Sequence, residues 1–243
     1  MTLFLGKPLL CATSFKIELN RPYLAKGLLL ASQVSILVGP PNTGKSSVVA
    51  CLAASISMGR TIGHIRVKRG AVLYVAAEDP NGIAERSHGY FHTEPTDLAH
   101  FHIHGWPINL ADDDEMATFC AEAQKFRRSF QAAQMLIVFD TLNLCIGDGD
   151  ENSARDMSRV IENAQRLARA TRAHVMIIGA SDQRVRLRRD GRLIGSTGAR
   201  QVSSVVFRCS RPAVEAVWRI SGRLVLMPST AVASGTGCRG RTR

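Results

Sequence analysis

The sequence predicts an α/β fold in which a mostly parallel sheet is covered by helices on both faces. Near-continuous apolar segments recur, with helical patterns between them, at 34–38, 71–76, 133–141 and 174–180. Strands buried on both faces read as continuous apolar runs, and their alternation with helices is typical of a parallel sheet. Short segments with two-residue alternation after residue 202 predict, in addition, a C-terminal antiparallel extension.

A phosphate-binding loop follows the first apolar strand. It reads Gly39-Pro40-Pro41-Asn42-Thr43-Gly44-Lys45-Ser46, a full match to the pattern GxxxxGK[ST]. Glycines let successive N–H groups point at phosphate oxygens, and the next helix adds the positive end of its dipole. We expect Lys45 to reach the β and γ phosphates of a bound nucleotide and Ser46 to bind Mg²⁺. Ser47 completes the predicted nucleotide site.

Helical periodicity predicts four helices between the strands. The first follows the loop and ends at Gly59, a C′ glycine. The others are expected at 82–92, from Asp112 to about Arg128, and from an N-cap at Asn152 or Ser153 to about Arg172. The acidic residues that open the third helix suit its positive end, so we assign them no catalytic role.

Carboxylates stand at the ends of two predicted strands. Glu78 and Asp79 follow the second strand, and Asp140 ends the third. In an open α/β sheet, ligands gather at the carboxyl ends of the strands. We therefore expect Asp140 to support Mg²⁺ as in a Walker B strand, and a carboxylate near the γ-phosphate to activate water. Glu78 is the first candidate for that base, and Asp79 is its rival.

Three histidines alternate at strand spacing: His100, His102 and His104. Alternation places them on one face of a strand, where they form either a metal site or a solvated surface. The low number of ligands favours the solvated surface.

Composition limits the class of protein and its partners. With 243 residues, of which 45% are hydrophobic, we expect one domain at 1–228 and a disordered basic tail at 229–243. The net charge of +11 favours an anionic partner, either nucleic acid or a membrane surface. Cysteines without CxxC spacing argue for a reducing compartment and against zinc. Because no signal peptide and no long apolar span is evident, we expect a cytoplasmic protein that is not in a membrane.

The segment 182–192 is rich in arginine, and it contains Arg184, Arg186, Arg188, Arg189 and Arg192. Such a segment does not pack in a core. Two interpretations stay open: a mobile surface loop, or an arm that contacts the phosphates of nucleic acid.

Residues 15 to 210 together resemble the RecA-like P-loop ATPases, and most of all their RepA-type group of plasmid and phage helicases. Four segments carry the resemblance: GPPNTGKS as the P-loop, VLYVAAED as the strand before the catalytic glutamate, LIVFDT as Walker B, and the signature GDENSARDM. The resemblance implies a RecA-like fold and an ATPase that uses ATP and Mg²⁺. It assigns catalysis to Lys45, Glu78 and Asp140.

The resemblance also implies partners. It implies a homo-oligomeric ring, such as a hexamer, that acts on single-stranded DNA as a replicative helicase or loader. Arg184, Arg186, Arg188 and Arg189 would contact DNA, and the segment GSTGARQ would follow that loop. The candidates for an arginine finger given to the neighbouring subunit are Arg200, Arg208 and Arg211.

The chain departs from the group at several positions. Ala180 and Ser181 stand where relatives carry a His or Gln-His sensor of the γ-phosphate, and Ile194 replaces an arginine. These differences leave nucleotide binding intact but question the coupling of hydrolysis to DNA movement. The alternative function is therefore a nucleotide-dependent DNA- or protein-binding regulator with weak or no hydrolysis. A small-molecule kinase is a third interpretation, for which the sequence shows no acceptor-site signature.

Overall fold

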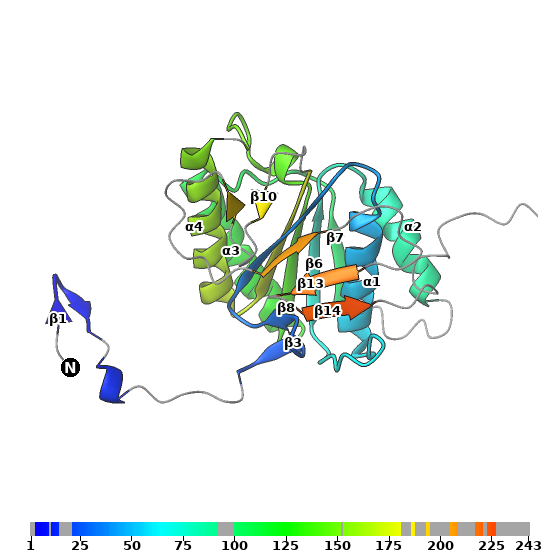
Figure 1. The fold of residues 1–243 in the computed structure, drawn as a ribbon, viewed down its shortest axis with the longest axis horizontal. Helices are drawn as coiled ribbons and strands as arrows, with labels where there is room; N and C mark the ends of the chain where they lie inside the picture. The colour runs from blue at the N-terminus through cyan, green and yellow to red at the C-terminus, as the bar shows by residue number, and fades with distance from the viewer. Residues whose placement is uncertain are drawn as a thin grey trace, which may run out of the picture.

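A six-stranded sheet forms the centre of the protein (Figure 1). In this computed structural model the described residues are 3–9, 11–14, 21–91, 100–151 and 153–180, with the backbone of short strands at 186–187, 193–194, 205–208, 217–220 and 223–226. The sheet order is β12-β5-β9-β8-β6-β7, and each neighbouring pair is parallel. Its strands are β5 (Val34–Gly39), β6 (Ala71–Ala76), β7 (Phe101–His104), β8 (Met135–Asp140), β9 (His174–Ala180) and β12 (Val205–Arg208). The predicted α/β fold is confirmed.

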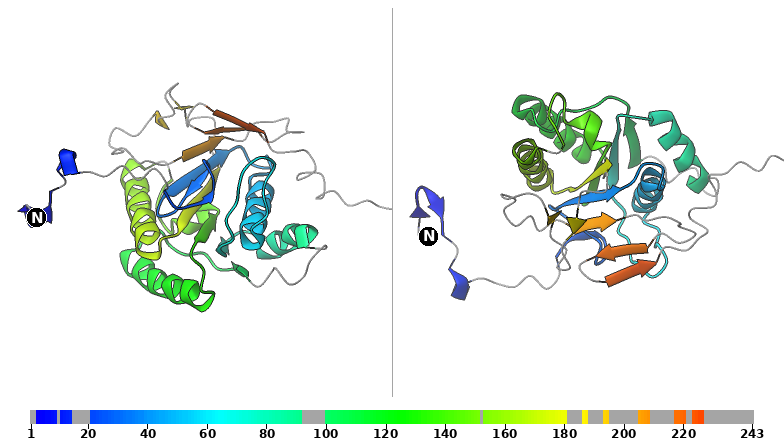
Figure 2. Two further views of the ribbon diagram at one scale, coloured as in Figure 1. Left: turned by 90° about the horizontal axis from the view of Figure 1, so that it is seen from below. Right: turned by 45° about the horizontal axis from the view of Figure 1, so that its top comes forward.

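Two layers of helices cover the sheet, as the views in Figures 1 and 2 show. The first layer holds α1 (Lys45–Met58) and α2 (Pro80–Phe91). The second layer, on the opposite face, holds α3 (Asp113–Ser129) and α4 (Ala154–Thr171). Helices on both faces are what a parallel sheet with crossover connections requires.

Strand alternation divides the core into two clusters, one on each face of the sheet. In β8, Leu136 and Val138 pack in the cluster under α1 and α2, whereas Ile137 and Phe139 pack in the cluster under α3 and α4. All four side chains are fully buried. Because successive side chains of a strand point to opposite faces, Asp140 lies on the face covered by α1. This is the helix that follows the P-loop.

The ends of α1, α3 and α4 agree with the sequence-based predictions, whereas α2 begins at Pro80, two residues before its expected start. Gly59 has φ +71° and ends α1, and its N–H contacts the carbonyl of Ile56. Asp112 accepts hydrogen bonds from the N–H groups of Asp114 and Glu115, so the acidic start of α3 is an N-cap. Ser153 is the N-cap of α4. The other candidate for that cap, residue 152, lies outside the described residues.

The C-terminal strands differ in part from the prediction. β13 (Val217–Ile220) and β14 (Arg223–Leu226) form the expected antiparallel pair. The strand before them, β12, was expected in the same extension, but it pairs parallel with β5 and joins the main sheet. A short apolar run such as Val205–Arg208 does not distinguish the two pairings by its periodicity, which explains the error. β10 (Arg186–Leu187) and β11 (Leu193–Ile194) form a small antiparallel hairpin within the arginine-rich region.

The N-terminal part consists of short β pieces and turns, as expected. β1 (Leu3–Phe4) pairs with β2 (Lys7–Pro8), and a 3-10 turn covers Ala12–Ser14. β3 (Tyr23–Ala25) and β4 (Leu29–Leu30) form a hairpin that precedes β5.

The alternating histidines lie in β7, an edge strand of the sheet, or directly before it, and they face α3. The ring of His102 lies 5.3 Å from the ring of Phe126 and 4.9 Å from that of Phe130, and His100 lies 5.3 Å from Phe130. Within the described ranges no group of three His, Cys, Asp or Glu side chains has a geometry that could hold a metal. The face is thus partly packed against aromatic rings, although His102 is exposed.

Among the described residues, no helix has the length and apolar character to cross a bilayer.

Candidate nucleotide-binding site

The P-loop connects the end of β5 to the start of α1. Asn42 and Gly44 adopt left-handed backbone conformations, with φ of +57° and +82°, and Gly44 is the N-cap of α1. These conformations curl the loop back over the helix end. The first N–H groups of a helix have no partner within the helix, and together with the helix dipole they attract an anion.

Lys45 lies across the loop. Its Nζ donates hydrogen bonds to the carbonyl oxygens of Gly39 and Pro40, both at 2.8 Å. Thr43 Oγ1 donates to the same Pro40 oxygen at 2.8 Å. Lys45 also lines the cavity beside the loop, and phosphate oxygens of a nucleotide bound there would replace these carbonyl oxygens as partners of the ammonium group.

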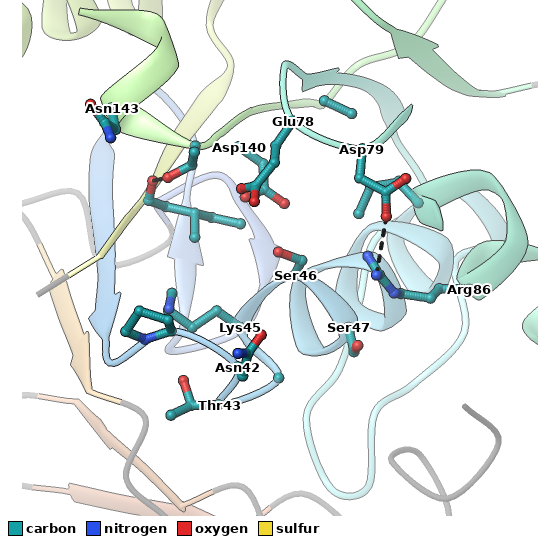
Figure 3. Close-up of a pocket in the computed structure, with 16 residues that line it drawn as sticks. Asn42, Thr43, Lys45, Ser46, Ser47, Glu78, Asp79, Arg86, Asp140 and Asn143 are labelled. Atoms are coloured by element: carbon teal, nitrogen blue, oxygen red, sulfur yellow. Dashed lines mark hydrogen bonds and ion pairs between the residues drawn. The ribbon is translucent and has the colours of Figure 1, made fainter. Parts of the chain in front are cut away.

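A cavity of about 530 Å³ opens at the carboxyl edge of the sheet beside this loop (Figure 3). This volume is in the range of small-molecule sites. The predicted site residues Pro41 to Ser47, Glu78 and Asp140 all line it. Gly39 and Pro40 do not line it but hold Lys45 through their carbonyl groups. The structure thus brings together three segments that are far apart in the sequence.

Asp140 lies at the base of the cavity with only 5% of its surface exposed. Its Oδ2 accepts a hydrogen bond of 2.7 Å from the hydroxyl of Tyr74, and Ser46 lines the same cavity. Burial raises the pKa of Asp140, and interactions with the Tyr74 and Ser46 side chains oppose the rise. Burial, followed by the charge of Asp140, raises the pKa of Tyr74 well above its usual value, so Tyr74 is a hydroxyl donor.

The structure distinguishes the two neighbouring carboxylates. Figure 3 shows Glu78 directed toward Ser46 and Asp140, whereas Asp79 turns toward α2. Asp79 Oδ1 accepts a hydrogen bond from the N–H of Gly82 at 2.8 Å, and Oδ2 lies 3.2 Å from Arg86. Asp79 lines the cavity but caps α2 with its carboxylate, whereas Glu78 is directed toward Ser46 and Asp140.

Several residues of the site were not among those predicted from the sequence. Arg86 and Asn143 line the cavity, and Tyr74 lies beneath it. Arg86 follows Asp79 by seven residues, a spacing that returns to the same side of a helix after two turns, so helical periodicity could have suggested it. Tyr74 gave only one signal, a hydroxyl within an otherwise apolar strand.

The predicted nucleic-acid and arginine-finger residues can be placed only in part. Arg186 lies in β10 and Arg208 at the end of β12. Arg208 is in register with Val38 of β5, one residue before the P-loop begins. Outside the described residues lie Arg184, Arg188, Arg189, Arg200, Arg211, Ser181 and the tail at 229–243.

Comparisons with known proteins agree with this geometry. A family model described as an AAA domain matches residues 14–181. A search of curated proteins gave no match. Among solved structures, "ATPase Domain of G40P" aligns with a TM-score of 0.54 and 13% identity, over 80% of each chain.

A second solved structure extends the comparison. "The Structure Of A DnaB-Like Replicative Helicase And Its Interactions With Primase" aligns with a TM-score of 0.53 and 11% identity. The alignment covers 81% of the present chain but only 54% of that protein, so the chain spans about half of its length. At such identities the two structures show the fold. From the family match over most of the sequence, the chain belongs to the AAA domain family and is a RecA-like P-loop ATPase.

Proposed function

We propose that the protein is a Mg²⁺-dependent ATPase that acts on DNA as a ring, either as a replicative helicase or as a helicase loader of a plasmid or phage type. The observation that carries the proposal is the convergence of the P-loop, Glu78 and Asp140 on one cavity. The titles of the two solved structures describe a helicase and an ATPase domain, which supports this choice of function.

The residues of the cavity supply the parts of phosphoryl transfer. The loop amides and Lys45 bind the β and γ phosphates. Glu78 orients a water molecule and accepts its proton while the water oxygen bonds to the γ-phosphorus and the bond to the ADP oxygen breaks. Glu78 is preferred to Asp79 for this role, because both oxygens of Asp79 are engaged with Gly82 and Arg86.

Ser46 and Asp140 fit a Mg²⁺ site. Both offer oxygen atoms, which this hard cation prefers, and both side chains line the cavity. The buried carboxylate also gains a compensating charge if a cation binds there. When bound, Mg²⁺ neutralises charge on the phosphate oxygens.

Action on DNA is supported by charge and by position. The net charge of +11 suits an anionic polymer, and we assign its contact to Arg184, Arg186, Arg188 and Arg189. The hairpin of β10 and β11 that includes Arg186 follows β9, a central strand of the sheet.

In a ring, an arginine from the neighbouring subunit would stabilise the transition state. Of the candidates Arg200, Arg208 and Arg211, only Arg208 lies in the described residues, on a strand that ends at the same sheet edge as the P-loop. Sedimentation with ATP and Mg²⁺ should detect the ring, and a chain that stays monomeric would contradict this part of the proposal.

Steady-state phosphate release, measured with the full chain and a titration of single-stranded DNA, tests the proposal. We expect Lys45→Ala to abolish turnover and DNA to stimulate the unmodified protein. Lys125→Ala is the matched control, since Lys125 lies on the surface of α3 and pairs only with Glu122 among the contacts described. Unchanged turnover in Lys45→Ala would refute the site, and turnover that is indifferent to DNA would refute the DNA part.

A further inference from the structure

Tyr74 places a hydroxyl group inside the apolar core. Its side chain is fully buried, and it belongs to the cluster under α1 and α2 that is otherwise built of aliphatic residues such as Leu52, Val138 and Met176. Its ring also packs near Phe101, with 6.1 Å between the ring centroids. A phenylalanine would fill the same volume without burying a polar group, which is unfavourable unless that group is hydrogen-bonded.

The partner of this hydroxyl is Asp140. The Tyr74 hydroxyl donates to Asp140 Oδ2 at 2.7 Å, and both groups are buried. The register of β6 and β8 pairs Tyr74 with Val138 and Ala76 with Asp140. Side chains two residues apart in a strand lie on the same face, so Tyr74 and Asp140 are diagonal neighbours on the α1 side of the sheet.

The hydroxyl groups of Ser46 and Tyr74 approach the Asp140 carboxylate from different sides. Ser46 belongs to the lining of the cavity, whereas Tyr74 does not line it and contacts the carboxylate from the core. The core contact engages Oδ2, one of the two carboxylate oxygens of a residue that also lines the cavity.

We propose that Tyr74 is a positioning residue that orients the Asp140 carboxylate for the Mg²⁺ bound with ATP. The inference rests on the proposed role of Asp140 in supporting the metal. Outer-shell partners of metal-linked carboxylates hold them in one orientation, and their loss typically weakens metal binding or activity by about 10- to 100-fold. A positioning role therefore predicts a selective effect on the metal.

The test is Tyr74→Phe, which removes one oxygen atom and keeps the ring. Mn²⁺ binding is followed by electron paramagnetic resonance with a non-hydrolysable ATP analogue, and the Mg²⁺ dependence of turnover is followed at saturating ATP. We expect the half-saturating metal concentration to rise by about tenfold. The affinity for a fluorescent ATP analogue in EDTA should stay the same.

Two controls separate positioning from packing. Tyr23→Phe makes the same chemical change at a half-buried tyrosine outside the cavity. Val138→Ala removes packing directly beside Tyr74 in the same core cluster and keeps both partners of the hydrogen bond. Both variants should bind metal as the unmodified protein does. If Val138→Ala weakens metal binding as much as Tyr74→Phe, or if Tyr74→Phe also loses metal-free nucleotide binding, Tyr74 has only a structural role.

Asp140→Asn separates this inference from the proposed function. If Asp140→Asn weakens metal binding and Tyr74→Phe does not, the positioning role is refuted while the site assignment stands. If Asp140→Asn binds metal normally, the proposed metal site is itself wrong.

Discussion

Asp79 and Arg86 face each other along the first two turns of α2, with 3.2 Å between Asp79 Oδ2 and Arg86 Nη2. The other oxygen of Asp79 caps the helix at Gly82. A Cβ atom at position 82 would overlap the Asp79 carboxylate, so the glycine is needed for this cap. The pair lies at the start of α2 and engages both oxygens of Asp79, while the preceding residue, Glu78, is directed toward Ser46 and Asp140.

This arrangement predicts opposite effects for the two carboxylates. Glu78→Gln should lower ATP turnover by about 10²- to 10⁴-fold, the usual contribution of a general base, with ATP binding retained. Asp79→Ala should retain most turnover and lower the free energy of unfolding by about 0.5–2 kcal/mol through loss of the N-cap. Phosphate release and urea unfolding measure the two effects. If Asp79→Ala is inactive and Glu78→Gln is active, the roles are reversed.

Substitution of Gly44 is expected to change stability through the backbone conformation alone. No atom lies within 4 Å of a Cβ built at this position, but φ is +82°. A residue with a Cβ pays roughly 1–2 kcal/mol in the left-handed region, so Gly44→Ala should lower stability by this amount or open the loop. Weaker binding of a fluorescent ATP analogue should accompany the loss, because the loop amides would change direction.

Gly59→Ala is the matched control for this prediction. Gly59 has φ +71° at the opposite end of the same helix, and it does not line the cavity. It should lower stability without changing nucleotide affinity. Equal loss of affinity in both variants would mean that the effect of Gly44→Ala comes from general destabilisation.

Local patterns were sufficient for the parts of the site that lie within one segment. The P-loop could be predicted because strand, glycine turn and helix follow one another in the chain. Glu78 and Asp140 could be predicted because both end apolar strands, and the carboxyl ends of parallel strands share one edge. Their roles in catalysis and metal binding remain proposals.

Relationships between segments could not be predicted in this way. The contact of Tyr74 with Asp140 depends on β6 lying next to β8 and on the register of that pair, neither of which is visible in the sequence. The parallel pairing of β12 with β5 depends on a crossover connection rather than on the composition of Val205–Arg208. The sequence already placed Glu78 before Asp79, but the contacts that engage Asp79 with Gly82 and Arg86 became visible only with the start of α2.

The arginine-rich segment predicts a salt-dependent interaction with single-stranded DNA. Neutralising Arg186, Arg188 and Arg189 to glutamine should weaken binding at low salt. If each contacts a phosphate, the slope of log affinity against log salt should fall by about 2, since each contact on a single strand contributes about 0.7. Fluorescence anisotropy with a labelled oligonucleotide at several salt concentrations measures both quantities.

A control of equal charge uses three exposed arginines on the α3 and α4 side: Arg128, Arg155 and Arg169. Neutralising these residues should change the salt slope little. If both triple variants behave alike, the interaction depends on net charge, and if neither changes binding, 182–192 is only a surface loop.

His174 joins three strands of the protein from a fully buried position at the start of β9. Its Nε2 lies 2.8 Å from the Ser35 hydroxyl on β5, and its Nδ1 lies 2.7 Å from the carbonyl of Leu30 on β4. Because a carbonyl can only accept, Nδ1 carries the proton and Nε2 accepts from Ser35. Burial lowers the pKa of His174 to about 4 in the folded protein, from about 6.5 when unfolded.

Because the pKa of His174 is lowered in the folded protein, we expect protonation of His174 to destabilise the fold in acid. Between pH 6.5 and 4 the unfolded chain binds a proton that the folded chain excludes, so stability is complete above pH 6.5 and falls as the pH drops toward 4. The loss from His174 should reach about 3 kcal/mol below pH 4. Urea unfolding at pH 7.5, 5.5 and 4.5 should show this slope, and His174→Asn should flatten it at some cost in stability at pH 7.5. His64→Asn, at an exposed position, should leave the slope unchanged, and a slope that persists in His174→Asn would assign the acid sensitivity to other groups.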